Sequence, residues 1–342
     1  MRPKAAKLAR RSLSAAPPGV RAALARGGSW IARESAAPSD GSPADGSGAA
    51  LDGRHLVPDR ALPLPPGVDE ARLRQLFSTW SIDGELPGHM DPYVADSFGR
   101  FVHTYGLVAD LEGTCLELGA NPYFATYLLE HHSELELSLA NYFENELDHT
   151  VQTLAYRGLD DSEVTEQLSS SLFNIEDDEF PYPDASFDVV LFCEIIEHLL
   201  MNPVHVLHKI RRVLRPDGVL VLTTPNVARL KNVLVLAAGG NIYDPYSGYG
   251  PYGRHNREYA MFELHALLGF MGFDVEQSFT ADSHPDAYED EPRFAEVASI
   301  VAERAGGLGQ YSFIRARMTR PARDGLPDLL YRSWPPGEIV AL

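Results

Sequence analysis

The stretch FDVVLFCEIIEHLL, residues 187–200, joins a run of strand-forming apolar residues to a dense group of ionisable ones. Glu194, Glu197 and His198 all follow directly after the apolar run. Residues three and four apart share one face of a helical turn, so the two carboxylates and the imidazole can converge. The pattern predicts a buried strand that delivers polar chemistry at its carboxyl end.

Strand-like and helical segments alternate on both sides of this stretch. The predicted strands are residues 114–120, 134–140, 171–175, 187–193, 219–226, 273–279 and 311–318. The predicted helices between them are residues 123–132, 202–214, 258–272 and 293–307, and the acidic stretch before residue 171 reads as irregular. Such alternation predicts an open, mostly parallel sheet with helices on both faces, in which ligands bind at the carboxyl ends of the strands.

Composition divides the chain into four parts. Residues 1–66 are rich in Pro, Gly, Ser and Ala, and we expect a disordered tail and linker outside the fold. Residues 67–110 have helical spacing and predict a cap, in which Asp91 is an N-cap and Pro92 the first helical residue. The main domain spans 111–320, and 321–342 form a C-terminal tail.

The charge distribution bounds the partners of this chain. The net charge is −19, yet the first 33 residues carry eight Lys or Arg and no acid. An acidic body repels phosphate backbones, which makes a nucleic-acid partner unlikely, whereas the basic segment could touch an anionic membrane surface weakly. Cys115 and Cys193 lie in apolar runs, which indicates buried thiols and a cytoplasmic protein. The sequence has no apolar window long enough for a transmembrane segment.

Several motifs together resemble the class I S-adenosylmethionine-dependent methyltransferases. They are LELG at 116–119, FPYPDASFDVVLFCEIIEHL at 180–199 and VLRPDGVLVLTTPN at 213–226, followed by the closing helix and strands. The resemblance covers residues 114–318 and implies a Rossmann-like seven-stranded sheet, mostly parallel with one antiparallel strand. It also implies S-adenosylmethionine as cofactor. The first turn departs from the family's pattern, because Asn121 and Tyr123 stand where two further glycines are usual.

The resemblance carries several cofactor contacts over to this chain. Glu117 and Gly119 take the places of the acid and the glycine after the first strand, and Asn121 is expected to meet the cofactor. An acid at the end of the second strand usually binds the ribose hydroxyls about 20 residues beyond the glycine turn, and that position is Asn141. The group that meets the adenine amine is Asn174 or Glu176, and Glu194 lines the cofactor pocket.

The pattern Glu-x-x-Glu-His with a later histidine suits a divalent ion. Two hard oxygens and an imidazole favour Mg²⁺, Mn²⁺ or Zn²⁺. This arrangement resembles the small-RNA 3′-terminal 2′-O-methyltransferases and the ubiquinone-pathway O-methyltransferases, which implies a metal site at Glu194, Glu197, His198 and His255. Glu197, His198 and His255 are then the catalytic residues. The alternative is that His198 acts without a metal as a general base.

A tyrosine-rich segment bears on the methyl acceptor. Residues 241–259 hold five tyrosines separated by glycines, a composition that suits carbohydrate or planar ligands. Parts of the chain also resemble methyltransferases of bacterial surface-polysaccharide synthesis. We therefore expect methyl transfer to a hydroxyl of a small-molecule or glycan acceptor: a sugar, a glycoconjugate or a related polyhydroxylated metabolite. A catechol, an RNA ribose and a non-catalytic partner protein are the alternatives.

Overall fold

The computed structural model describes residues 56–57, 59–86, 88–143, 147–284, 288, 291–304, 306–335 and 337–342. The predicted basic tail and most of the predicted linker lie outside the described residues. The described part of the linker packs on the domain, in contrast to the expectation. Leu56 and Val57 are buried in a small cluster with residues 230–234 and 294–301. Leu62 and Leu64 pack against the main core.

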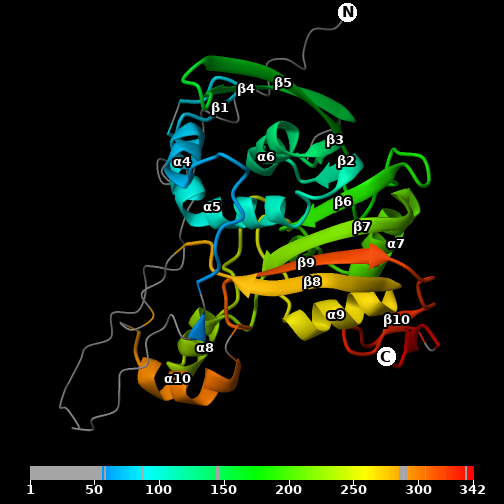
Figure 1. The fold of residues 1–342 in the computed structure, drawn as a ribbon. Helices are drawn as coiled ribbons and strands as arrows, with labels where there is room; N and C mark the ends of the chain where they lie inside the picture. The colour runs from blue at the N-terminus through cyan, green and yellow to red at the C-terminus, as the bar shows by residue number, and fades with distance from the viewer. Residues whose placement is uncertain are drawn as a thin grey trace, which may run out of the picture.

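The described strands form one nine-stranded sheet in the order β1-β4-β5-β3-β2-β6-β7-β9-β8 (Figure 1). The strands are β1 (Ser81–Ile82), β2 (Glu112–Leu118), β3 (Glu134–Asn141), β4 (His149–Arg157), β5 (Glu163–Leu172), β6 (Phe187–Cys193), β7 (Leu214–Pro225), β8 (Phe273–Ala281) and β9 (Tyr311–Met318). Strands β5, β3, β2, β6 and β7 pair in parallel, whereas β9 is antiparallel to β7 and β8. This arrangement confirms the predicted Rossmann-like α/β sheet.

Strands β1 and β4, at one edge of the sheet, were not predicted. The stretch before residue 171 forms a long hairpin of β4 and an extended β5 instead of an irregular connection, and β1 pairs with β4. Leu154 and Tyr156 of β4 are buried, and the Tyr156 ring stacks on Trp80 at 5.2 Å between centroids. The alternation is hard to recognise in the sequence because Gln, Thr, Glu and Ser occupy the outer face of the hairpin.

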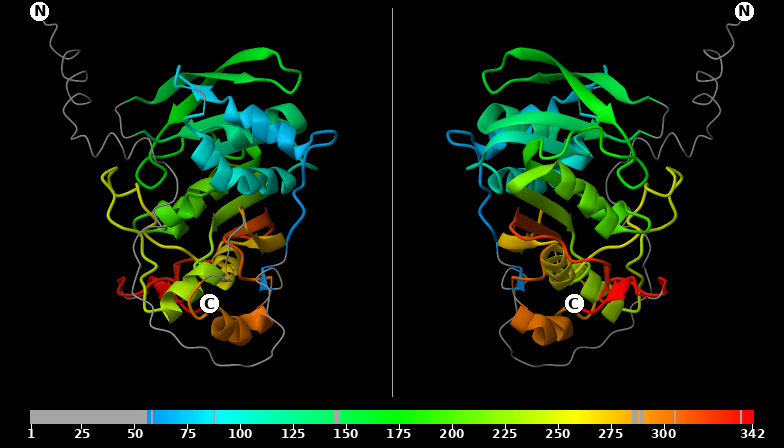
Figure 2. Two further views of the ribbon diagram at one scale, coloured as in Figure 1. Left: turned by 90° about the vertical axis from the view of Figure 1, so that its left-hand side faces the viewer. Right: turned by 90° about the vertical axis from the view of Figure 1, so that its right-hand side faces the viewer.

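Helices cover both faces of the sheet (Figures 1 and 2). The helices are α4 (Glu70–Ser78), α5 (Asp91–Gly106), α6 (Phe124–His132), α7 (Pro203–Val213), α8 (Leu230–Ala237), α9 (Met261–Phe270) and α10 (Phe294–Val301), with short 3-10 turns η2 (Ile196–His198) and η4 (Ala302–Arg304). Successive strand residues point to opposite faces. Cys115 therefore packs with α4, α5 and α6, and its neighbour Leu116 packs with α7 and α9.

The predicted helical cap is formed by α4 and α5. Phe77 of α4 and Phe98 of α5 are buried and lie 6.0 Å apart between ring centroids, and Phe77 also contacts Phe124 of α6 at 4.8 Å. Asp91 is the first residue of α5 rather than its N-cap, because Met90 holds that position without a side-chain hydrogen bond. The cap is therefore joined to the sheet domain through an aromatic core, and it stands beside the β2–α6 turn.

The C-terminal residues also pack on the domain. Leu326–Pro327 and Ile339–Val340 pair as the short parallel strands β10 and β11, and Tyr331 is buried with its hydroxyl bonded to Val204 N and Asn202 Oδ1. Among the described residues, the helices are too short or too polar to cross a bilayer. Both cysteines are free thiols. Cys115 is buried, whereas Cys193, the last residue of β6, is only partly covered.

Candidate active site

The turn between β2 and α6 is closed by its own hydrogen bonds. Gly119 has φ of +68°, a conformation that side chains disfavour, and a Cβ there would lie 3.1 Å from Ile195 Cδ1. Gly119 N and Ala120 N both donate to Ala140 O, at 2.8 and 3.2 Å. Asn121 N donates to Asn141 Oδ1 at 2.8 Å. The turn without its two usual glycines is thus held compactly against the end of β3.

Asn141 holds the β2–α6 turn from the end of β3. The side chain is 5% exposed, and its amide nitrogen donates to Tyr123 Oη and Ser170 Oγ while its oxygen accepts from Asn121 N. These bonds hold the β2–α6 turn. Asn141 also lines a cavity beside this turn, and its Oδ1 can accept one more hydrogen bond, so a contact with a ribose hydroxyl stays a prediction.

Two neighbouring cavities form a cleft at the carboxyl ends of β2 and β6. One has a volume of about 270 Å³ and is lined by Arg100, Glu117 and Thr223; the other has about 310 Å³ and is lined by Tyr142, Phe173 and Asn174. Both share Leu118, Gly119, Asn121, Glu194 and Ile195 as lining residues. The first has charged groups and the second apolar and amide groups. This division fits the amino-acid end and the nucleoside end of S-adenosylmethionine.

Glu117 is the buried acid of the cleft. The side chain is 5% exposed, and its Oε2 accepts a hydrogen bond of 2.7 Å from Thr126 Oγ1. Burial raises the pKa of this carboxyl to about 8, although the bond from Thr126 acts against the shift. A cationic ammonium placed here would favour the ionised carboxylate.

Asn174 and Glu176 lie differently with respect to the cleft. Asn174 lines it, and its amide nitrogen donates to Tyr252 Oη at 3.0 Å. Glu176 lines neither cavity. Its carboxylate instead accepts hydrogen bonds from the backbone of Leu200 and Met201. Of the two residues predicted to meet the adenine amine, only Asn174 lines the cleft, and the contact with adenine stays a prediction.

Glu194 turns away from the predicted metal ligands. Its φ of +56° directs the side chain to the cap, where Oε2 lies 2.7 Å from a guanidinium nitrogen of Arg100. Its Oε1 accepts a hydrogen bond of 2.8 Å from Thr223 Oγ1. Both carboxylate oxygens are therefore occupied. Glu194 lines the cofactor cleft as expected, but among the described residues it does not join the cluster that could hold an ion.

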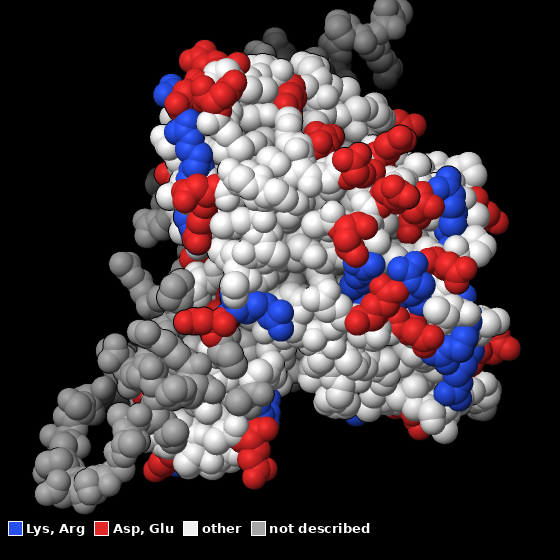
Figure 3. Space-filling model, in the orientation of Figure 1, with Lys and Arg blue, Asp and Glu red and all other residues white. Residues whose placement is uncertain are grey.

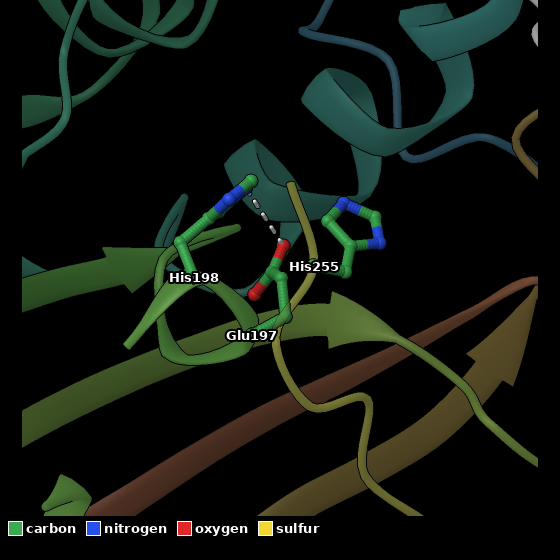
Figure 4. A group of neighbouring side chains, drawn as sticks. All are labelled: Glu197, His198 and His255. Atoms are coloured by element: carbon green, nitrogen blue, oxygen red, sulfur yellow. Dashed lines mark ion pairs between the residues drawn. The ribbon is translucent and has the colours of Figure 1, made fainter. Parts of the chain in front are cut away.

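Glu197, His198 and His255 do come together (Figure 4). Each offers one ligand atom, and these three atoms lie within 4.8 Å of one another. Glu197 and His198 belong to the turn after β6, and His255 belongs to the segment before α9. Glu197 is fully buried. Its Oε2 accepts from Thr224 Oγ1 at 2.9 Å, but Oε1 has no hydrogen-bond partner among the described residues.

Both histidines are anchored through Nδ1. His198 Nδ1 lies 2.9 Å from Arg254 O, and His255 Nδ1 lies 3.1 Å from Glu258 Oε1. An acceptor at Nδ1 fixes the orientation of the ring and leaves Nε2 as the nitrogen that can face an ion, an arrangement that is usual for metal-binding histidines. Glu258 is itself paired with Arg229 at 2.5 Å. The three groups could hold a divalent ion, which would have to replace the protons that Glu197 and His255 carry near neutral pH.

Electrostatic coupling within this cluster is strong. Burial raises the pKa of Glu197 to about 8, helped by Glu194 and opposed by His255. Burial acts to lower the pKa of His255, but Glu258, Glu197 and Asp244 outweigh it and raise the value to about 8. Burial and the nearby His255 lower the pKa of His198. His198 is therefore neutral at pH 7 and can bind an ion or accept a proton.

A third and larger cavity lies on the other side of the cluster. It has a volume of about 590 Å³, and its lining includes Tyr243, Asp244, His255, Asn256 and Tyr259. His198 lines the cofactor cleft, and Leu199 lines both spaces. The cluster thus stands between the cofactor cleft and a cavity of ligand size.

Sequence reasoning missed two residues of this site. Arg100 comes from the cap, and its position in α5 gives no sign of a contact with the turn after β6. Glu258 was given no role, although its spacing of three from His255 is a usable signal for a carboxylate that orients a metal-binding histidine.

Part of the chain matches a known protein family. Residues 117–222 match the family described as Methyltransferase domain. No curated protein matches the sequence. Among solved structures, the chain is similar to a putative methyltransferase from Haloferax volcanii in complex with the Trm112 methyltransferase activator, at 17% identity over 65% of this chain and 91% of that chain, with a TM-score of 0.41.

Two further solved structures have similar overlap. A SAM-dependent methyltransferase from Aquifex aeolicus is 13% identical over 73% of this chain and 94% of that chain, with a TM-score of 0.34. A possible histamine N-methyltransferase from Thermotoga maritima is 16% identical over 64% and 89%, with a TM-score of 0.39. The chain thus contains a methyltransferase domain on a Rossmann-like sheet, and the domain match indicates an S-adenosylmethionine-dependent methyltransferase.

Proposed function

We propose that this enzyme transfers the methyl group to a hydroxyl of a sugar, glycoconjugate or related polyhydroxylated metabolite, with activation by a divalent ion. One observation carries the proposal. The buried Glu197 Oε1 lacks a hydrogen-bond partner among the described residues, and two histidines with anchored Nδ1 atoms lie beside it. An unpaired buried carboxylate oxygen is costly unless a cation or a proton meets it.

Glu197, His198 and His255 are the residues that would hold the ion. Methyl transfer breaks the carbon–sulfur bond of the sulfonium and forms a carbon–oxygen bond, and the hydroxyl proton must leave. When bound, a divalent ion lowers the pKa of a nearby hydroxyl, which makes it a better nucleophile at neutral pH. If no ion is bound, His198, whose pKa is lowered by burial and which lines the cofactor cleft, would be the group that takes up the proton instead. Thr224 holds the Glu197 carboxylate in position.

The surroundings of the large cavity favour a polyhydroxylated acceptor. Tyr243, Tyr246 and Tyr249 are 80, 93 and 61% exposed on the segment that borders this cavity. Exposed tyrosines offer an apolar ring for stacking and a hydroxyl for hydrogen bonds, which suits sugar rings. Asn256 and Asp244 add polar groups in the lining.

Two alternatives have a different methyl acceptor, and the third is a protein that does not catalyse methyl transfer. A catechol would use the same ion with two adjacent hydroxyls. Figure 3 shows basic side chains interspersed with acidic ones on the face in view, without the broad basic surface that an RNA substrate favours. A non-catalytic partner protein would not need a cleft that fits both ends of the cofactor.

An acceptor screen tests the proposal. The enzyme is incubated with S-adenosylmethionine, one divalent ion and panels of sugars, nucleotide sugars, glycosides and catechols, and mass spectrometry detects the gain of one methylene. We expect a product from the sugar panel that disappears with EDTA. A product from catechols alone would refute the acceptor class. A product that persists in EDTA would refute the ion and favour His198 as a bare general base.

A further inference from the structure

The β2–α6 turn has no backbone N–H group left for a ligand between residues 119 and 123. Gly119 N and Ala120 N donate to Ala140 O, Asn121 N donates to the Asn141 side chain, and Tyr123 N donates to Ala120 O. Pro122 has no N–H. A carboxylate that enters the cavity beside this turn must therefore find its main cationic partner on another element.

Arg100 is the only Lys or Arg among the described residues that line this cavity. It projects from cap helix α5, and its side chain is 10% exposed. One terminal nitrogen lies 2.7 Å from Glu194 Oε2, and the other donates to Tyr93 Oη at 2.7 Å. The guanidinium carbon also lies 5.3 Å from the Phe101 ring centroid and 5.4 Å from that of Tyr311. These contacts fix the direction of the guanidinium group.

The charges around the cavity match an α-amino acid. Arg100 supplies a cation, and Glu117 and Glu194 supply two carboxylates in the lining of the same space; Glu194 is paired with Arg100, whereas Glu117 comes from β2. A guanidinium group has five N–H donors in a planar fork, so it can bind a second carboxylate while it keeps its bond to Glu194. The methionine part of the cofactor carries one ammonium and one carboxylate group.

We propose that Arg100 binds the α-carboxylate of the methionine part of the cofactor, so that the N-terminal cap completes the cofactor site. Glu194 and Tyr93 position the guanidinium before the ligand arrives. Without ligand, the ion pair with Glu194 compensates the buried charge of Arg100. The inference rests on the methyltransferase class alone and is independent of the proposed acceptor and ion.

Calorimetry with two ligands tests this role. S-adenosylhomocysteine carries the amino-acid group, and 5′-methylthioadenosine has the same nucleoside and thioether without it. In Arg100→Gln we expect the affinity for S-adenosylhomocysteine to fall about 10- to 100-fold, the usual range for a charge-assisted hydrogen bond. The affinity for 5′-methylthioadenosine should stay within about twofold of the wild-type value. Arg100→Lys should recover part of the loss, because it keeps the charge and loses the fork.

Two controls separate binding from folding. Removal of Arg100 leaves the partly buried Glu194 unpaired, so the double variant Arg100→Gln/Glu194→Gln removes both charges and should show the same selective loss. Arg74 of α4 also lies over an aromatic ring, at 3.8 Å from the Phe98 centroid, but outside the cavity. Arg74→Gln should bind both ligands like the wild type. Equal losses for both ligands in the Arg100 variants, or no loss for S-adenosylhomocysteine, would overturn the inference.

Discussion

Glu197 Oε1 and His198 Nε2 lie 3.9 Å apart, and Oε1 has no hydrogen-bond partner among the described residues. The two atoms are too far apart for a hydrogen bond with each other. They are close enough to serve the same small cation, to which His255 adds the third ligand atom. This spacing is the physical basis of the proposed ion site, and it makes Glu197 the first residue to change.

Glu197→Gln should separate ion binding from cofactor binding. The amide keeps the shape and the contact with Thr224 but removes the negative charge that an ion needs. We expect ion affinity to fall by more than the roughly 10- to 100-fold that is typical when a residue that only orients a metal ligand is changed. Methylation of the acceptor identified by the screen should fall in parallel, while calorimetry shows S-adenosylhomocysteine affinity within about twofold of the wild-type value. Unchanged methylation would show that Glu197 holds no catalytic ion.

Glu258→Gln should weaken the ion site through His255. The variant loses the carboxylate that fixes His255 Nδ1, so ion affinity should fall about 10- to 100-fold. Glu263→Gln is the matched control, because Glu263 lines the same cavity and pairs with Arg257 rather than with a histidine. Calorimetric titration with the divalent ion measures ion affinity in Glu258→Gln and Glu263→Gln. Equal effects of the two variants would contradict a specific role for Glu258.

Gly119→Ala should impair cofactor binding. The new Cβ would sit at a positive φ, which costs about 1 kcal/mol, and 3.1 Å from Ile195 in the wall of both cofactor cavities. Gly239→Ala introduces a comparable φ strain, at +84°, in open space away from the cleft. We expect both variants to lose similar stability in chemical denaturation but only Gly119→Ala to lose S-adenosylhomocysteine affinity. A similar affinity in both variants would argue against the assigned cleft.

His103 should make the fold sensitive to acid. The imidazole is 2% exposed between the rings of Phe279 and Phe313, and burial, together with the charge of Arg60, lowers its pKa to about 4. In the unfolded chain the pKa is about 6.5. The unfolded state therefore binds a proton first as the pH falls. The stability that neutral His103 provides is complete above pH 6.5 and is lost as the pH approaches 4, by about 3 kcal/mol in total.

The test of the His103 prediction compares pH slopes rather than single stabilities. Denaturant unfolding of the wild type and His103→Gln is followed between pH 4 and pH 7. The wild type should lose more stability than the variant over this interval. Parallel curves would show that His103 is not the group responsible.

Most of the sheet could be predicted from the sequence, because buried parallel strands such as β2, β6 and β7 are nearly continuous apolar runs between helices with clear periodicity. The β4–β5 hairpin could not, since its outer face carries polar residues and its partner Trp80 lies far away in the chain. Asp91 was misplaced by one position. A proline at the start of a helix marks the region but not the capping residue.

The site was predictable where it follows local spacing. Glu197 and His198 lie in one turn, and that turn points them toward His255. Glu194 departs from the prediction because its positive φ, which spacing does not reveal, turns it to Arg100. Asn141 was placed correctly at the end of β3, but the sequence could not show that its side chain would also hold the β2–α6 turn. The carboxylate of Glu176 accepts hydrogen bonds from the backbone of Leu200 and Met201 after η2, which spacing also does not reveal.

The central claim is that Glu197, His198 and His255 bind one divalent ion next to the cofactor cleft. The most direct measurement is a calorimetric titration of EDTA-treated, dialysed protein with Mg²⁺, Mn²⁺ and Zn²⁺, in parallel for the wild type, Glu197→Gln and His255→Ala. We predict one ion per wild-type chain for at least one metal, and strongly reduced binding in both variants, with S-adenosylhomocysteine affinity retained. No binding of any of the three ions, or equal binding by the wild type and both variants, would contradict the claim.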